Sequence, residues 1–260
     1  IARQMLRCVA ETGGWTRVRA DVDEILVEGN KAVGVRLSSG EEIRSQRVVS
    51  AVGVMSTARR LLPNHVDTDW VRSVDALSPA PAHVCLYIGF KGDIRAAGAG
   101  AANKWFYETW KMEPAYWEVQ PDRAPEEAPV LYCSFPSLKD PNHDPGPEML
   151  HTGEAVTFVP WDVFEPWRDK KWKKRGEDYE AFKKAMGDRL LSQLLRHMPE
   201  LEPMVDYVEL STPLSTDNFC RPVRGSIYGI EPTPERYQCD ALRAHTPIKN
   251  LFLSGSEVAT

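Results

Sequence analysis

Several common signatures are missing from this sequence. No apolar run approaches the length of about 18 residues that a membrane-spanning helix needs. The N-terminal stretch IARQMLRCVAE carries charges throughout and therefore lacks the layout of a secretory signal peptide. Lys and Arg number 32 against 37 Asp and Glu, which gives a net charge of -5 and no basic excess for binding nucleic acid. We therefore expect neither a membrane-spanning protein nor a nucleic-acid partner.

The patterns that mark metal and hydrolase sites are also absent. The five cysteines are widely spaced and form no C-x-x-C pair, which is typical of reduced thiols in a cytosolic protein. The six histidines show no H-x-x-x-H spacing, so we expect no metal site. No G-x-S-x-G turn is present, and Ser254 in LSGSE does not match one. Serine hydrolase chemistry is therefore not expected.

What remains is the composition of a globular protein. With 260 residues, 42% hydrophobic and 27% charged, the chain is long enough for one large or two smaller cores. Apolar residues at helical spacing predict a helix over residues 1–9. Alternating apolar residues over 25–37, with turns at Gly29-Asn30 and Ser39-Gly40, predict a small antiparallel meander.

A proline-bearing hinge, LSPAPAH (77–83), separates this region from a second predicted sheet. Its strands are expected in HVCLYIGF (83–90), VLYCSFPS (130–137) and AVTFVPW (155–161). An apolar stripe predicts a helix from Tyr179 to His197, which Pro199 ends. Between Pro213 and Pro234 no period is clear, so we expect extended loop with short strands.

The main functional signal is a pair of short apolar strands that end in small residues. RVVSAVG ends at Gly53, and NLFLSGSE runs into Ser254-Gly255-Ser256. Small residues at a strand end let a backbone approach a ligand closely. A strand and turn of this kind normally lead into a helix whose N–H groups receive an anion. One such turn alone is more often an ordinary tight connection.

Taken in order, three stretches resemble the carotenoid desaturase, carotenoid isomerase and retinol saturase family of flavoproteins. They are GGWTRVRADVDEILVEGNKAVGVRLSSGEEIRSQRVVSAVG, LSTDNFCRPVRGSIYGIEPTPERY and HTPIKNLFLSGSEVAT. The resemblance covers nearly the whole chain and is firmest in residues 1–63 and 216–260. The all-trans-retinol saturase-like branch fits best, through STPLSTDNF and TPERY.

This resemblance implies a mixed α/β fold: an FAD-binding two-dinucleotide-binding-domain flavoprotein fold, incomplete here, with an inserted α+β substrate domain. Residues 1–78 and 222–260 would belong to the FAD-binding domain, and residues 79–221 to the substrate-binding domain. No G-x-G-x-x-G follows a strand in the sequence, so we expect the first FAD motif upstream of Ile1. We accordingly expect a C-terminal fragment that also lacks the flavin-facing helix and is inactive by itself.

The resemblance also assigns cofactor contacts to five residues. Val22 matches the position whose backbone meets the adenine, although a plain strand residue is an equal alternative. Ala51 and Gly53 match the turn near the adenosine and pyrophosphate. Gly255 and Glu257 match the final turn, where an acidic residue, more often Asp in the family, contacts the ribityl-pyrophosphate region. No catalytic acid or base is assigned, because the cofactor performs the redox step.

Two aromatic-rich stretches have weaker interpretations. The run WRDKKWKKRGEDYEAFKK interleaves Trp167 and Trp172 with lysines, which could rest on an anionic membrane surface. A solvated basic loop before the next helix is the alternative. A group of aromatic residues between Trp105 and Trp117 could line an apolar substrate tunnel, or could form ordinary core.

The function implied by the resemblance is that of an FAD-dependent oxidoreductase. It would transfer hydride between the flavin and a carbon-carbon bond of a long apolar polyene or isoprenoid, with saturation, desaturation and isomerisation all open. We expect a cytoplasmic protein, with peripheral membrane contact as a further hypothesis. The alternative is a non-catalytic lipid-binding escort protein, because escort proteins for prenylated GTPases resemble the same fold without flavin chemistry.

Overall fold

The computed structural model describes residues 2–66, 68–111 and 116–258. These residues form two compact units, one from 1–77 with 233–260 and the other from 78–232. Compared with the predicted segments, the second unit is longer by Ser78 and by residues 222–232. The reason is local pairing within that unit, since Pro79 lies opposite Ile230 in a β-bridge and Ala82 lies opposite Ser226.

The first unit contains the predicted antiparallel meander. Strands β1 (Val22–Glu28), β2 (Lys31–Leu37) and β3 (Glu42–Arg44) form a sheet of that order, and the meander prediction is confirmed. The predicted first helix is present as α1 (Ala2–Glu11), in which no residue is buried. Gly34 is required for the close approach of β2 and β3, because a Cβ there would lie 2.3 Å from the carbonyl oxygen of Ile43.

The first unit also holds the two strands that carry the functional signal. Strand β4 (Val48–Ser50) pairs with β10 (Leu251–Leu253) in parallel, although the two are far apart in the sequence. Helix α2 (Val54–Ser56) follows β4 and continues as one π-helical turn (Thr57–Leu61). Two further helices belong to this unit, α3 (Asp69–Asp75) and α6 (Pro234–Gln238).

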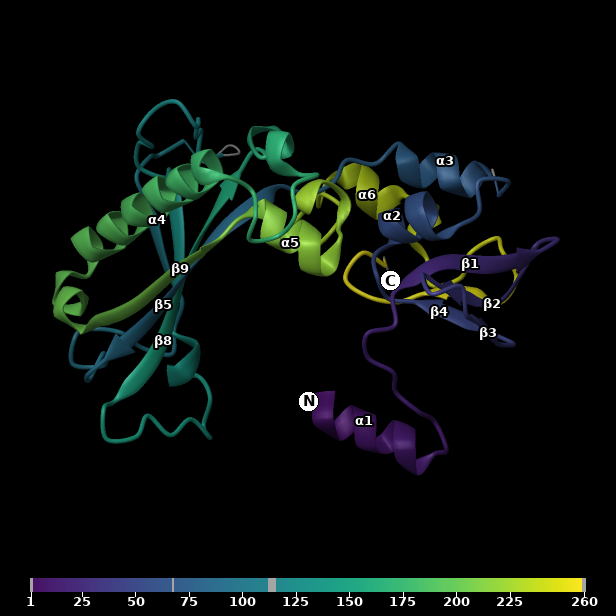
Figure 1. The fold of residues 1–260 in the computed structure, drawn as a ribbon, viewed down its shortest axis with the longest axis horizontal. Coiled ribbons are helices and arrows are strands. Elements are labelled where there is room, and N and C mark those ends of the chain that lie inside the picture. Colours follow the sequence, from purple (N-terminus) through teal and green to yellow (C-terminus); the bar gives the residue numbers. More distant parts are fainter. Residues whose placement is uncertain (1, 67, 112–115, 259–260) are drawn as a thin grey trace. The chain divides into compact units, whose positions relative to one another are not determined.

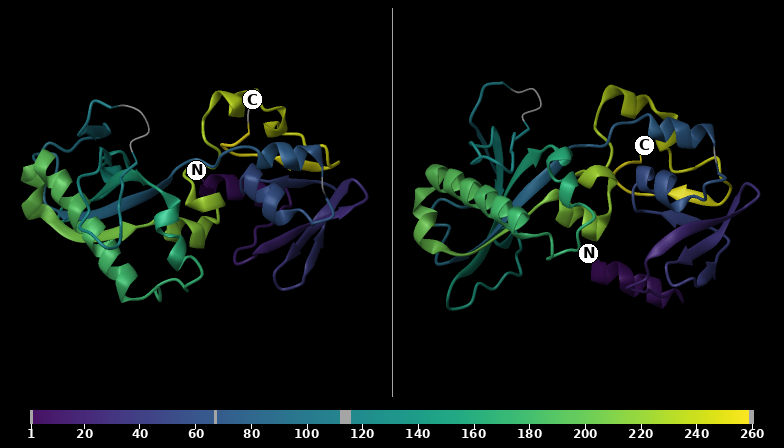
Figure 2. Two further views of the ribbon diagram at one scale, coloured as in Figure 1. Left: turned by 90° about the horizontal axis from the view of Figure 1, so that it is seen from above. Right: turned by 45° about the horizontal axis from the view of Figure 1, so that its top comes forward.

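The second unit is a five-stranded antiparallel sheet in the order β6-β7-β8-β5-β9. The strands are β6 (Lys104–Tyr107), β7 (Val130–Ser134), β8 (Leu150–Val159), β5 (Ala82–Lys91) and β9 (Val205–Ser211). Helix α4 (Glu177–His197) runs along one face of the sheet (Figure 1). The two views in Figure 2 show α4 on that same face.

The main hydrophobic core of this unit lies between α4 and the sheet. Val84, Leu86, Ile88 and Phe90 alternate along β5 and are buried against the apolar stripe of α4. That stripe consists of Phe182, Met186, Leu190 and Leu194. Burying one such side chain contributes about 1.5–3 kcal/mol, so this layer fixes the position of the sheet. The opposite face of β5 is left for other contacts.

One expectation from the sequence is wrong. The stretch from Pro213 to Pro234 is not extended loop with short strands, because it begins with helix α5 (Pro213–Cys220). Pro213 occupies the first turn, where its missing N–H costs nothing, and Leu214 is buried. Tertiary packing therefore defines a helix that is too short to show a period in the sequence.

Candidate functional site

The carboxyl ends of β4 and β10 lie side by side. The strands pair in parallel, with Val48 opposite Leu251 and Ser50 opposite Leu253. Just beyond them, the backbone N–H of Ser254 donates to the carbonyl of Ser50 at 2.9 Å. In open α/β sheets, ligands bind in the crevice outside the carboxyl ends of the strands. The two turns singled out in the sequence therefore meet at one edge of this unit.

Across this edge, Glu257 is held by the backbone that follows β4. Its Oε2 accepts the N–H of Val54 at 2.7 Å and the N–H of Met55 at 3.3 Å. Its Oε1 lies 2.6 Å from the point where a Cβ would stand on Gly53, whose φ is 95°. Only glycine combines that backbone conformation with so close an approach. Gly53 and Glu257 therefore form one local structure.

Burial and the neighbours of Glu257 shift the pKa of its carboxyl in opposite directions. The residue is only 8% exposed, and this burial raises the pKa of its carboxyl above the usual value. The hydrogen bonds from Val54 and Met55 and the charge of Arg236 act in the opposite direction. Arg236 lies beside this turn, where its Nη2 donates to the carbonyl of Ser256, the residue before Glu257, at 2.6 Å.

A buried hydroxyl pair fixes the turn between β4 and α2. Thr57 Oγ1 donates to the carbonyl of Gly53 at 2.6 Å. Its distance to Ser50 Oγ is 2.7 Å. Because the Thr57 proton is used for Gly53, Ser50 must be the donor in that second bond. The end of β4 is therefore tied to the turn by side chains as well as by backbone.

The other predicted contacts are placed differently. Ala51 is exposed beyond β4, and no atom lies within 4 Å of the point where a Cβ would stand on Gly255. These two positions fit the close approach that FAD would need. Val22 is half-buried in β1, opposite Leu37 in the meander sheet. The cofactor contacts of Val22, Ala51, Gly53, Gly255 and Glu257 all stay predictions.

A second candidate site lies on the open face of the sheet in the other unit. Alternation on β5 places His83, Cys85 and Tyr87 on the face opposite the main core. They contribute to a cavity of about 340 Å³. Its other lining residues are Trp105, Val130, Tyr132, Glu154, Val156, Phe158, Ile227 and Tyr228. Aromatic and aliphatic walls with few polar groups are typical of pockets for apolar small molecules.

Three titratable groups in this cavity have pKa values shifted toward the neutral form. Burial lowers the pKa of His83, whose Nδ1 is buried without a hydrogen-bond partner among the described residues. Burial raises the pKa of Cys85 to about 12 and that of Tyr87 to about 12. At neutral pH these three side chains therefore bring no net charge to the cavity.

Among the aromatic residues between 105 and 117, one forms core and another lines the open-face cavity. Trp117 is core, with its indole N–H donating to the carbonyl of Glu126 at 2.9 Å. Trp105 is 51% exposed and lines the cavity on the open face, where its ring contacts Tyr132 edge-on at 4.9 Å. Trp110 is 99% exposed and belongs neither to the core nor to the lining of the cavity. The alternation along β5 is the sequence signal that could have predicted this cavity, because it turns one face of the strand away from the core.

The basic run before α4 contains one buried and one exposed tryptophan. Trp167 is buried, and its indole donates to the Asp178 carboxylate at 2.8 Å. Trp172 is exposed and meets the ring of Phe219 edge-on at 5.1 Å. Among the described residues, no helix is both long and apolar enough to cross a membrane. In the same ranges, no cluster of three or more His, Cys, Asp or Glu side chains is arranged to hold a metal ion.

Comparison with curated proteins finds relatives that align with nearly the whole chain. The zebrafish (Danio rerio) all-trans-retinol 13,14-reductase is 29% identical over 99% of this chain and 44% of its own length. A second zebrafish relative, an inactive all-trans-retinol 13,14-reductase, is also 29% identical, over 100% of this chain and 45% of its own length. The neurosporene-forming phytoene desaturase of Cereibacter sphaeroides is 46% identical over 98% of this chain and 48% of its own length. No family model matches the chain.

Solved structures share the fold. An oxidoreductase from Methanosarcina mazei superposes with a TM-score of 0.56, covering 97% of this chain and 47% of that protein at 15% identity. Cyclohexylamine oxidase from Brevibacterium oxydans gives a TM-score of 0.54 over 99% and 46% at 11% identity. The predicted fold class is thereby confirmed. The chain spans about half the length of the curated relatives it matches.

Proposed function

Because the chain is homologous to all-trans-retinol 13,14-reductases and to a phytoene desaturase, we propose that it is part of an FAD-dependent oxidoreductase. The substrate would be a long apolar polyene or isoprenoid, altered at a carbon-carbon bond. The observation that carries this proposal is the cavity on the open face of the sheet. Its walls are mainly aromatic and aliphatic, three of its titratable side chains are held neutral, and Glu154 is its one acidic lining residue.

The cavity suits a chain of conjugated double bonds for two physical reasons. Flat polyenes pack well against the faces and edges of aromatic rings, and Trp105 and Tyr132 present an edge-on pair there. Because His83, Cys85 and Tyr87 are neutral, the free energy of desolvating them when an apolar ligand binds is lower than for charged groups. The residues of the chain would then bind and orient the polyene and exclude water from it.

FAD, when bound, supplies hydride transfer, and this chain would contribute the edge at the ends of β4 and β10. Ala51 and Gly255 would allow the cofactor to approach the backbone. Glu257 would shape that edge by fixing Gly53 and the start of α2. Saturation, desaturation and isomerisation remain alternatives, because the redox state of the flavin and the electron partner decide the direction.

Peripheral contact with a membrane is a finer part of this proposal. The Trp172 and Phe219 rings are both exposed and touch each other, and lysines flank Trp172 in the sequence. Such a patch is suited to the interface of an anionic bilayer, from which a polyene could be extracted. The solvated basic loop remains the alternative for the rest of the run.

A second candidate function is a non-catalytic lipid-binding protein of the same fold. Two observations favour it: an inactive relative is as similar as an active one, and Glu257 has hydrogen-bond partners within its own chain. The acidic residue could therefore persist for structural reasons after loss of the flavin. Under this alternative, the open-face cavity would still bind an apolar ligand.

The test is the absorbance spectrum of the product of the open reading frame that contains this chain. After extensive dialysis, the proposal predicts the paired flavin bands in the near-ultraviolet and blue, and release of FAD on denaturation. A colourless protein that cannot be loaded with FAD but still binds retinoid would favour the lipid-binding alternative. The 260-residue chain expressed alone serves as a control, because it is expected to be inactive.

A further inference from the structure

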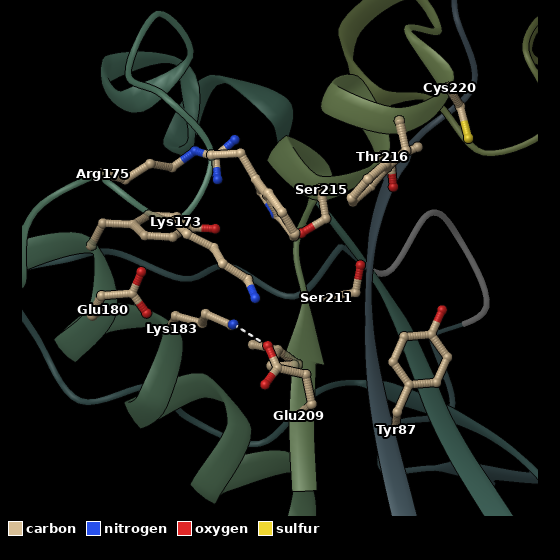
Figure 3. A pocket seen from close by; sticks show the side chains of 14 residues that line it. Tyr87, Lys173, Arg175, Glu180, Lys183, Glu209, Ser211, Ser215, Thr216 and Cys220 are labelled. Atoms are coloured by element: carbon tan, nitrogen blue, oxygen red, sulfur yellow. Dashed lines mark hydrogen bonds and ion pairs between the residues drawn. The ribbon is translucent and has the colours of Figure 1, made fainter. Parts of the chain in front are cut away.

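A third cavity lies in the second unit and shares one lining residue, Tyr87 of β5, with the open-face cavity. It has a volume of about 390 Å³ and is bounded by α4, α5, β9 and the basic loop before α4. Its polar lining includes Lys173, Arg175, Lys183, Ser211 and Ser215. In Figure 3 the three basic side chains come from one side of the cavity and the two serines from the other.

Arg175 is the most unusual of these residues, because it is a buried charge without a carboxylate partner among the described residues. Its side chain is only 5% exposed. Its Nη2 donates to the carbonyl of Leu214 at 3.2 Å, and its guanidinium lies 5.4 Å from the ring centroid of Tyr179. Its Nε is buried and has no partner there. A buried cation normally requires an anion to offset its lost hydration.

The rest of the cavity leaves room for such an anion. Lys183 is paired with Glu209, so this carboxylate is already engaged. Lys173 faces the ring of Trp172, with Nζ 4.7 Å from the centroid, and no ion pair is found for it in the described ranges. Glu180 is the other acidic lining residue. Three cations therefore stand against two carboxylates, with hydroxyl groups of Ser211, Ser215 and Thr216 on the facing wall.

We propose that this cavity binds a phosphate group, held by Arg175 and Lys173 and by the hydroxyls of α5. Guanidinium and ammonium groups together with Ser and Thr hydroxyls are the donors that recognise phosphate oxygens. The phosphate could belong to a lipid headgroup, since the exposed Trp172 and Phe219 rings also line this cavity. It could equally belong to a soluble phosphate ester. The two sources share the same recognition chemistry.

The test is calorimetric titration of the full 260-residue chain with inorganic phosphate, at ionic strength held constant with sodium chloride. Lys173→Glu should weaken binding by about tenfold or more, because a charge-assisted contact is lost and a repulsive charge is added. Lys171→Glu is the matched control, since it lies in the same exposed run but does not line the cavity. Ser215→Asp places a negative charge on the opposite wall and should weaken binding similarly. Circular dichroism checks that each variant is folded.

Saturable binding that Lys173→Glu and Ser215→Asp weaken, and that Lys171→Glu leaves within about twofold, supports the proposal. Absence of saturable binding, or equal losses in all three variants, overturns it and leaves only a diffuse charge effect. Sedimentation with phosphatidylcholine vesicles, with and without phosphatidic acid, separates the sources. Co-sedimentation that phosphatidic acid induces and Lys173→Glu abolishes identifies a headgroup. Phosphate binding without co-sedimentation identifies a soluble ester.

Discussion

Glu257 accepts the backbone N–H of Val54 at 2.7 Å across a separation of 203 residues. This hydrogen bond joins the turn after β10 to the start of α2, so it closes the edge at which the two parallel strands end. Both partners are buried, and the same carboxylate also accepts the N–H of Met55. The geometry gives this residue a structural task that can be tested without any cofactor.

Glu257→Ala should lower the free energy of unfolding by about 1–3 kcal/mol, because two buried N–H groups lose their acceptor. Glu257→Gln keeps a carbonyl oxygen that can accept the same bonds, and it should cost less than about 1 kcal/mol. Urea denaturation of both variants measures the difference. Equal losses in the two variants would mean that the negative charge, rather than the acceptor, stabilises this edge.

The pH dependence of stability should carry the signature of Glu257. Burial raises the pKa of its carboxyl in the folded chain, so the folded state binds this proton more readily than the unfolded state. Its contribution to stability is therefore present at low pH and is lost as pH rises from the ordinary carboxyl range through the raised value. Melting temperatures across this window should fall less in Glu257→Gln than in the parent chain.

Gly53→Ala should destabilise the chain by about 1–3 kcal/mol, through backbone strain at φ 95° and through the clash with Glu257 Oε1. Gly40→Ala is the matched control. Its φ is 86°, but no atom lies within 4 Å of the added Cβ. Denaturation of the two variants should show a larger loss at position 53. A loss of the same size at both positions would show that the contact with Glu257 adds nothing.

Glu108 should make the second unit sensitive to acid. Burial acts to raise its pKa, but hydrogen bonds from His197, Gln193 and Arg196 outweigh burial and the pKa is lowered. The distances to Glu108 Oε1 are 2.6, 3.1 and 2.6 Å, respectively. Its stabilisation is therefore present above the ordinary carboxyl range and is lost as pH falls through the lowered value.

Glu108→Gln should cost about 1 kcal/mol at neutral pH and should flatten the acid limb of a plot of melting temperature against pH. Glu200→Gln, at an exposed position beyond α4, is the control that removes a carboxylate of the same type. An unchanged acid limb in Glu108→Gln would show that other carboxylates set the acid sensitivity.

Trp105→Ala should weaken binding of a retinoid to the open-face cavity by about tenfold, because truncating a packed aromatic wall costs on the order of 1–2 kcal/mol. Trp110→Ala is the control, since Trp110 is 99% exposed and does not line the cavity. Quenching of tryptophan fluorescence by added retinol measures the affinity. Similar affinities for the two variants would place the apolar ligand elsewhere.

Local patterns in the sequence predicted much of the fold. Alternation indicated the meander and β5, and the apolar stripe of α4 indicated its length to within a few residues. Helix α5 could not be predicted, because a helix of eight residues depends on burial of Leu214 in the folded unit. Strand β9 also had no clear signal, since only Leu210 is fully buried along it.

The candidate sites were predicted less completely. The small residues at the ends of β4 and β10 drew attention to the correct edge, but the contact between Gly53 and Glu257 depends on their parallel pairing. Pairing across 200 residues is a property of the tertiary fold and not of a local pattern. The burial of Arg175 could not be predicted, because burial of a single side chain in a charged segment has no sequence signal.

The proposed function is tested most directly by following the absorbance of the flavin and of the polyene in one cuvette. The product of the complete open reading frame is loaded with FAD, made anaerobic and mixed with retinoids and carotenoids in either redox state of the flavin. We predict that at least one polyene shifts its own conjugated absorption. In saturation or desaturation the flavin absorbance changes stoichiometrically in step, and in isomerisation the flavin returns to its starting state. A protein that binds these polyenes while neither their absorption nor the flavin spectrum changes with any of them, in both redox states, would contradict the proposed function.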